Sequence, residues 1–183
     1  SNLEKLLEIK IPFIKYNIDL IDKLYFDEAK KLLPQKRYIG FSITQGNEYR
    51  KKSWSLNGFI NIAKKISEGG KQPVFFIEKK NTELINNIKK KINNAIFPEL
   101  ESSFSGPPLI TALATRLDKV ISIDNGIMHM IGLANIPMIV LFGPTNSFKF
   151  APKIKNIDIL DSKQIYNSDD ILKIKEEDIL KFI

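Results

Sequence analysis

From residue 37 onward, short apolar runs alternate with segments in which apolar positions recur every three or four residues. Four apolar runs of five or six residues are typical of buried parallel strands, and they span residues 38–42, 73–77, 119–123 and 137–142. The segments that carry apolar residues at helical spacing lie at about residues 55–68, 82–92, 107–113 and 126–134. Strands that alternate with such helices predict βαβ units, and therefore a Rossmann-like, mostly parallel α/β sheet with flanking helices.

Local signals mark where several of these elements begin and end. Ser55 suits the N-cap of the first helix and Gly69-Gly70 closes it, while Pro107-Pro108 suits the start of a later helix, where a missing N–H costs nothing. Residues 95–97 predict a short third strand that Pro98 ends. The tail predicts one more strand at residues 157–160 and a final helix at residues 176–182.

The first 36 residues differ from the rest of the chain in their pattern of apolar and polar positions. Residues 3–9 form a short amphipathic piece, and residues 26–33 predict a helix that Pro34 stops. We interpret residues 1–36 as a linker or hinge from a neighbouring N-terminal domain, with a boundary near Pro34. Residues 37–183 then form the domain that contains the parallel sheet.

The loops that follow the predicted strands should meet at one edge of the sheet, where ligands of open α/β folds bind. They are residues 44–53, 78–83, 104–106, 124–126 and 143–145. Among them, Asp124-Asn125-Gly126 leaves an apolar strand and opens a helix, so a phosphate can approach the N–H groups at Gly126. His129, the only histidine, shares the Gly126 face of that helix. The alternative is that Asp124 only caps the helix and that His129 is a half-buried side chain without a ligand. The position of both residues at a strand-to-helix turn favours a role in ligand binding.

Other residues at this edge of the sheet are weaker candidates for ligand binding. Lys52 lies in the basic loop after the first strand and can reach phosphate oxygens, whereas Trp54 is expected to anchor that loop against the domain. Glu78 and Glu83 follow the second strand, where a carboxylate can accept hydrogen bonds from ribose hydroxyls or simply cap a helix. Thr145 closes what we interpret as a tight turn without ligand contact.

Composition narrows the class of protein. The chain of 183 residues is 43% hydrophobic and 27% charged, which is typical of a soluble globular protein, and its net charge of +7 suits anionic partners. The absence of cysteine excludes a disulfide framework and a zinc-thiolate site, and it fits a cytoplasmic protein. Without a GxGxxG or GxxxxGK[ST] sequence, NAD-dependent oxidoreductases and P-loop NTPases are disfavoured. No RNA-reading motif indicates a nucleic-acid partner.

Two of these segments, together with the basic loop, resemble the C-terminal domain of glycosyltransferase family 9, the heptosyltransferase family. Residues 122–129 read Ser-Ile-Asp-Asn-Gly-Ile-Met-His and residues 137–145 read Pro-Met-Ile-Val-Leu-Phe-Gly-Pro-Thr. The family shows D-[ST]-G-x-x-H, then a strand and F-G-P-T. The Lys52-Ser53-Trp54 sequence is similar to its K-x-W element. Asn125 departs from the family by replacing a small hydroxyl residue.

The resemblance implies a GT-B architecture, of which this chain would be the C-terminal half, and a set of donor-binding residues. In that reading Lys52, Gly126 and His129 lie at the diphosphate, Asn125 lies beside them, and Asp124 holds sugar hydroxyls. Glu83, with Glu78 as the second choice, would hold ribose, and Ser105 would lie near the base. The donor would be a nucleotide-diphosphate sugar such as ADP-heptose, bound without a metal or other cofactor.

The resemblance also implies what this chain does not contain. The catalytic base belongs to the family's N-terminal domain, so no catalytic residue is expected here, and the isolated chain should bind donor but transfer poorly. The acceptor would be a lipopolysaccharide or other glycan, and peripheral association with the inner membrane stays open. The alternative is a non-catalytic nucleotide- or carbohydrate-binding module of the same fold. A GT-B-shaped sugar-nucleotide epimerase would need further acidic and histidine residues.

Overall fold

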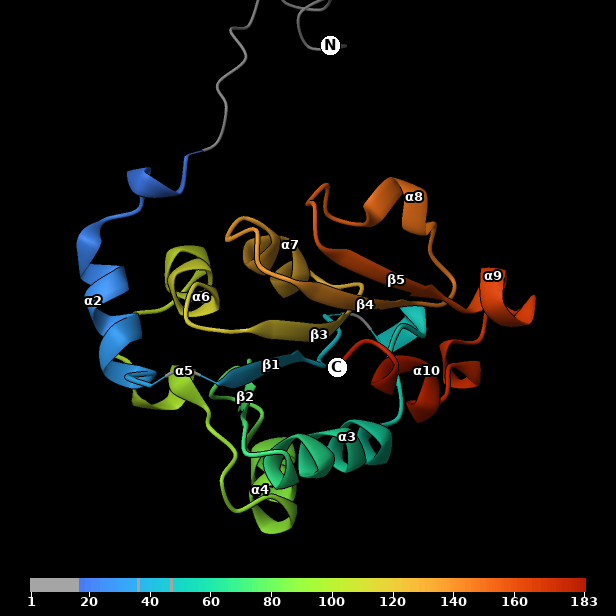
Figure 1. Ribbon diagram of the computed structural model, residues 1–183, viewed down its shortest axis with the longest axis horizontal. Helices are drawn as coiled ribbons and strands as arrows, with labels where there is room; N and C mark the ends of the chain where they lie inside the picture. Colours follow the sequence, from blue (N-terminus) through green and yellow to red (C-terminus); the bar gives the residue numbers. More distant parts are fainter. Residues whose placement is uncertain (1–16, 36, 47) are drawn as a thin grey trace, which may run out of the picture.

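The protein is built around a five-stranded, all-parallel sheet, seen in a computed structural model that describes residues 17–35, 37–46 and 48–183. The sheet order is β2-β1-β3-β4-β5 (Figure 1). The strands are β1 (Tyr38–Ser42), β2 (Gln72–Phe75), β3 (Lys119–Ile123), β4 (Met138–Phe142) and β5 (Ile157–Asp161). This confirms the predicted Rossmann-like parallel α/β fold.

The central strands are buried on both faces, which explains their continuous apolar sequences. Every residue of β1 and β4 is buried. In β1, Phe41 lies opposite Phe75 of β2 and Ile121 of β3, so the register aligns the ends of these strands. Because neighbouring strands run parallel and in register, the loops that leave their carboxyl ends emerge at one edge of the sheet.

Helices cover the two faces of the sheet as two separate layers (Figure 1). One layer contains α3 (Leu56–Glu68), α4 (Thr82–Lys91) and α10 (Glu176–Leu180), which pack on a cluster that includes Ile39, Phe41 and Ile139. The other contains α2 (Lys23–Leu32), α6 (Pro107–Ala114) and α7 (Gly126–Gly132), which pack on alternate strand residues. The side-chain period of two along each strand therefore divides the core into two halves.

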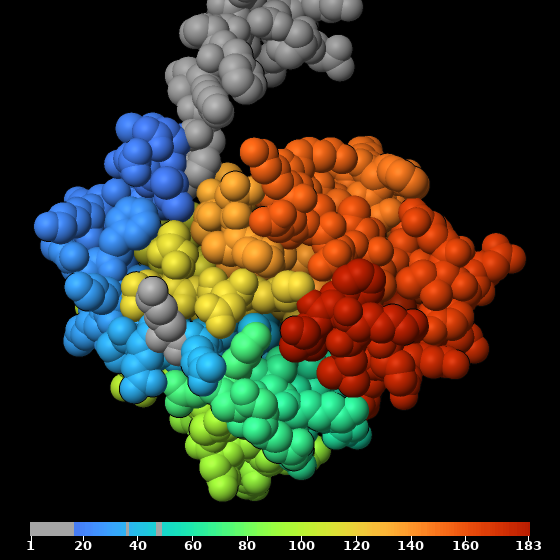
Figure 2. Space-filling model, in the orientation of Figure 1, coloured from blue at the N-terminus to red at the C-terminus, as the bar shows by residue number. Residues whose placement is uncertain are grey.

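The remaining elements are short. They are the helices α5 (Pro98–Glu101), α8 (Ser147–Phe150) and α9 (Ser162–Tyr166) and the 3-10 turns η1 (Ile18–Leu20), η2 (Glu48–Arg50) and η3 (Ile171–Lys173). The C-terminal segment, dark red in Figure 2, lies between α3 and α9. Its buried residues Ile171, Ile174 and Ile179 join the same core cluster as α3.

Most predicted boundaries agree with the structure, and the capping signals act as expected. The Ser55 side chain accepts a hydrogen bond from Gly58 N, Gly70 has a positive φ of 76° after α3, and Pro107 opens α6. The predicted third strand at residues 95–97 is wrong as a strand, because only one parallel bridge, Val74 to Ile96, forms there. Pro98 has no N–H to extend the pairing and instead begins α5.

The N-terminal part of the described chain packs on the domain that follows it. Ala29 and Leu33 are fully buried against the α6 and α7 side of the core. Arg116 donates hydrogen bonds to the carbonyl oxygens of Leu33, Pro34 and Gln35. The boundary near Pro34 stays a prediction, as does the amphipathic piece at residues 3–9, which lies outside the described residues. None of the described helices has the length and apolar character that a membrane crossing requires.

The docking of α2 can be tested by truncating a buried side chain. We expect Leu33→Ala to lower the free energy of unfolding by about 2–5 kcal/mol, the usual cost of a buried Leu→Ala change, because Leu33 is 0% exposed. The control is Leu24→Ala within α2, whose side chain is 58% exposed, and it should change stability little. Urea denaturation measures both values. Equal effects would mean that α2 is a linker element outside the cooperative unit.

Candidate functional site

A cavity of about 740 Å³ lies at the carboxyl edge of the sheet. It gathers five of the residues that the sequence predicts for ligand binding: Lys52, Asp124, Asn125, Gly126 and His129. It is also lined by residues that the predicted set omits: Gln45, Gly46, Arg50, Pro144, Thr145 and Phe150. The loops after β1, β3 and β4 therefore meet as expected at one site.

Asp124 lies at the centre of this site and joins all three loops. It follows β3 directly and is only 5% exposed. Its Oδ2 atom accepts hydrogen bonds from Lys52 Nζ at 2.5 Å and from Thr145 Oγ1 at 2.7 Å. No described residue donates to its other oxygen, Oδ1, and that atom is not among the buried atoms without a partner. Within the described part of the chain, Oδ1 therefore has no donor and can accept a further hydrogen bond.

Asn125 ties the loop after β1 to the start of α7. Its Oδ1 accepts a hydrogen bond from Met128 N at 2.8 Å, which makes it the N-cap of the helix. Its Nδ2 donates to Ser42 Oγ at 2.8 Å and to Thr44 O at 2.9 Å. The side-chain amide is thus occupied within the protein, and its structural role explains why asparagine suits this position.

Gly126 and His129 present an open surface to the cavity. A Cβ built at Gly126 meets no atom within 4 Å, so the space in front of its backbone is free. His129 is exposed, lies one turn further along α7, and lines the same cavity. Within the described residues, no group of three or more His, Asp or Glu side chains is placed to hold a metal ion.

The basic loop after β1 is fixed at both ends. Gln45 Oε1 accepts a hydrogen bond from Lys52 N at 2.8 Å, which closes the loop between them. Trp54 is 7% exposed, and its Nε1 donates to Ile174 O at 2.8 Å, while its ring packs edge-on against Phe59. Trp54 therefore anchors the loop against the C-terminal segment, as predicted.

The turn at residues 143–145 is part of the site and more than a connection. A Cβ at Gly143 would lie 2.7 Å from Ile171 Cβ and 2.9 Å from Ile171 N, so only glycine fits there. This close approach allows the turn to place Pro144 and Thr145 on the cavity. The prediction did not assign Thr145 to the site, because its bond to Asp124 joins residues 21 positions apart.

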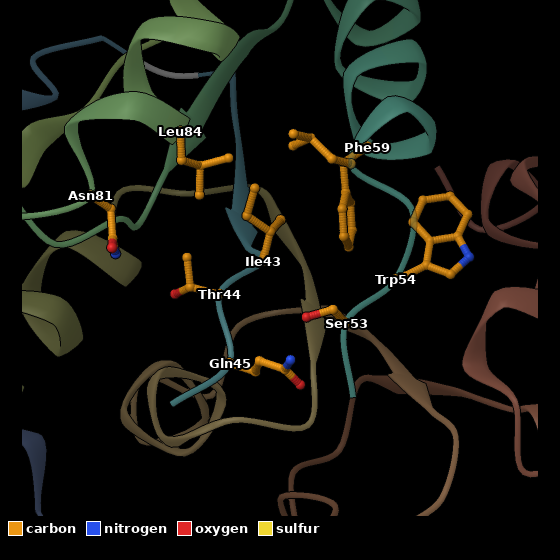
Figure 3. Close-up of a pocket in the computed structure, with 9 residues that line it drawn as sticks. Ile43, Thr44, Gln45, Ser53, Trp54, Phe59, Asn81 and Leu84 are labelled. Atoms are coloured by element: carbon orange, nitrogen blue, oxygen red, sulfur yellow. The ribbon is translucent and has the colours of Figure 1, made fainter. Parts of the chain in front are cut away.

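Two predicted residues lie outside the large cavity. Ser105 is exposed on the loop before α6, and Glu83 lines a separate hollow of about 490 Å³ beside Asn81 and Leu84. A smaller hollow of about 290 Å³ lies between the large cavity and the Glu83 hollow and is shown in Figure 3. It shares Gln45 with the large cavity and shares Asn81 and Leu84 with the Glu83 hollow. In Figure 3 the Trp54 ring nitrogen points away from this hollow. The three hollows therefore lie next to one another between His129 and Glu83.

One acidic residue near the second strand has an unusual environment. Partial burial raises the pKa of Glu99 above its usual range, and the neighbouring carboxylate of Glu78 raises it further, against the opposing charge of Lys79. Its Oε1 atom is buried without a hydrogen-bond partner. Glu99 lines none of the three hollows, so it is not part of the site described above.

Comparison with known proteins defines the family. The chain matches glycosyltransferase family 9 (heptosyltransferase) over residues 3–180 and belongs to that family. No curated protein sequence matches it.

Solved structures share the fold at low sequence identity. The glycosyl transferase family 9 protein from Veillonella parvula DSM 2008 is 21% identical with a TM-score of 0.72, and the match covers 88% of this chain and 50% of that one. ADP-heptose lps heptosyltransferase II of E. coli is 16% identical with a TM-score of 0.70, covering 96% and 54%. E. coli heptosyltransferase WaaC with ADP is 13% identical with a TM-score of 0.69, covering 98% and 52%. The chain thus spans about half the length of these proteins.

Gly126 and Gly143 should respond in opposite ways to an added methyl group. We expect Gly143→Ala to destabilise the fold by about 1–3 kcal/mol, because its Cβ would overlap Ile171. Gly126→Ala should leave the free energy of unfolding unchanged or slightly higher, because the space is open and alanine favours a helix. Thermal unfolding of the two variants checks the pair, and a destabilised Gly126→Ala variant would contradict the open geometry.

Proposed function

We propose that this protein is a glycosyltransferase that moves a heptose-like sugar from a nucleotide-diphosphate donor, such as ADP-heptose, to a lipopolysaccharide or other glycan acceptor. Residues 37–183 would be its donor-binding part. The observation that supports the proposal is the convergence of Lys52, Asp124, Gly126 and His129 on one cavity, in a chain of glycosyltransferase family 9. A solved relative is a heptosyltransferase with ADP, and another is named an ADP-heptose heptosyltransferase.

The donor would lie across the three neighbouring hollows. Its diphosphate would lie in the large cavity beside Gly126, His129 and Lys52, and the free Oδ1 of Asp124 would accept a hydrogen bond from a sugar hydroxyl. The nucleoside would extend past Gln45 and Asn81, which places its ribose within reach of Glu83. Ser105 is proposed to lie near the base.

The reaction would be a displacement at the anomeric carbon. The bond between that carbon and the phosphate oxygen breaks, its electron pair stays on the phosphate, and the acceptor oxygen forms the new bond after losing its proton. Lys52, His129 and the Gly126 N–H would stabilise the departing diphosphate without a metal. The base that removes the acceptor proton would belong to an N-terminal domain outside this chain, so we expect the isolated chain to bind donor but transfer poorly.

Replacing Asp124 by its amide tests the sugar contact. We expect Asp124→Asn to weaken binding of an ADP-sugar by about tenfold, because a charge-assisted hydrogen bond to a sugar hydroxyl becomes a neutral one. Binding of ADP without sugar should change less. The matched control is Asp158→Asn on β5, which removes an ion pair with Lys119 at 3.7 Å and lines none of the hollows.

Calorimetric titration of the wild-type chain and both variants gives these affinities. Equal weakening by Asp124→Asn and Asp158→Asn would contradict a specific role for Asp124. Failure of the wild-type chain to bind any ADP- or UDP-sugar would contradict the proposed function itself.

A lipid-linked acceptor would bring the protein to the cytoplasmic face of the inner membrane. The surface next to the cavity suits that location, because Phe148 is 77% exposed and Phe150, which lines the cavity, is 39% exposed. Lys149, Lys153 and Lys155 are exposed in the same segment, and Lys149 Nζ lies 5.2 Å from the Phe150 ring centre. Aromatic and basic side chains together favour contact with an anionic lipid surface.

Vesicle sedimentation tests this surface. We expect the chain to bind vesicles that contain phosphatidylglycerol and not neutral vesicles, and we expect Phe148→Ser combined with Lys149→Glu to reduce that binding. The control is Leu172→Ser combined with Lys173→Glu, which changes an exposed apolar and basic pair in η3, where Leu172 is 59% exposed. An equal loss in the control would show only a general effect of net charge.

A further inference from the structure

The charges that line the large cavity are not equally available to a ligand. Lys52 and Asp124 form an ion pair at 2.5 Å, and their side chains are only 12% and 6% exposed. The pair therefore contributes almost no net charge to the cavity. Arg50 lines the same cavity, is exposed, and has no ion pair or hydrogen bond from its side chain to any described residue. Its guanidinium therefore supplies an uncompensated positive charge to the site.

The conformation of the loop holds Arg50 at the cavity. The hydrogen bond from Lys52 N to Gln45 Oε1 closes the loop, and Arg50 ends the short turn η2 inside it. The next residue, Lys51, has a φ of 47°, which is the left-handed region that lysine rarely adopts. This backbone reversal separates the two neighbouring basic residues, because Arg50 lines the cavity and Lys51 does not.

We propose that Arg50 is a specificity-determining residue that binds the diphosphate of a nucleoside diphosphate or its sugar derivative. This inference rests on the proposed function and deepens it. An incoming diphosphate needs positive charge that is not already neutralised, and Lys52 can offer its charge only in competition with Asp124. A guanidinium presents several N–H groups in a planar fork that matches two phosphate oxygens, so Arg50 suits this role better than a second lysine.

The proposal predicts selectivity for two phosphates over one. The departing nucleoside diphosphate has more negative charge than the intact donor, because the electron pair of the broken bond stays on its terminal phosphate. Arg50 therefore binds the product diphosphate at least as tightly as the donor. Removing Arg50 should weaken binding in proportion to the phosphate charge of the ligand and leave binding of an uncharged nucleoside unaffected.

The test compares two adjacent basic residues by NMR titration of the 183-residue chain with ADP, AMP and adenosine, and in parallel with UDP, UMP and uridine. We expect Arg50→Ala to weaken binding of the diphosphate by tenfold or more, about 1.4 kcal/mol, with a smaller effect on the monophosphate and none on the nucleoside. Arg50→Lys should recover part of the loss. The control is Lys51→Asn, which removes the same charge with a residue that tolerates the left-handed backbone, and it should change binding by less than twofold.

The outcomes separate this inference from the proposed function. If the wild-type chain binds the diphosphate and Arg50→Ala weakens it no more than Lys51→Asn does, Arg50 is not the diphosphate ligand and the proposed function stands. If Arg50→Ala weakens nucleoside and diphosphate equally, the variant has disturbed the loop and the claimed phosphate selectivity is wrong. If the wild-type chain binds neither ADP nor UDP, the proposed function fails and the inference fails with it.

Discussion

The ion pair between Lys52 and Asp124 is the interaction on which the site depends, because it joins segments that the chain keeps 72 residues apart. Asp124 ends β3, Lys52 belongs to the loop after β1, and Thr145 adds the turn after β4 to the same carboxylate oxygen. Asn125 makes a second connection between β1 and α7 through Ser42 and Thr44. The parallel sheet brings these loop ends together, and their polar contacts fix how they meet.

The burial of this pair has an energetic consequence for any ligand. Loss of one partner from a buried ion pair costs several kcal/mol, because the remaining charge is left without compensation. A diphosphate that drew Lys52 away from Asp124 would leave the carboxylate uncompensated and facing the negative phosphate. A ligand that offers a hydroxyl to Oδ1 of Asp124, and its phosphate to other cations as well as Lys52, avoids that cost. The geometry therefore favours a ligand with both groups, as a sugar nucleotide has.

The fold could be predicted from the sequence where buried elements leave a continuous pattern of apolar residues. Strands buried on both faces read as apolar runs, which is why β1, β3, β4 and the beginning of β2 were found within one or two residues of their bounds. The predicted strand at residues 95–97 was wrong because an edge segment with Pro98 behind it makes only one bridge. The short helices α5, α8 and α9 have four or five residues, too few for a helical period to be recognised.

The site could be predicted where residues follow one another on a strand-to-helix turn, and not where they meet through space. Asp124, Gly126 and His129 lie within one such turn, whereas Thr145 and Gln45 reach the site through side-chain bonds to Asp124 and to the Lys52 backbone. Arg50 and Lys51 are adjacent basic residues in the sequence, and only the folded loop, with its left-handed backbone at Lys51, has Arg50 and not Lys51 on the cavity. The conformation of this loop thus decides which positive charge a ligand can use. Since Lys52 is already paired, the proposed binding of a diphosphate would depend on Arg50, which no spacing rule distinguishes from its neighbour Lys51.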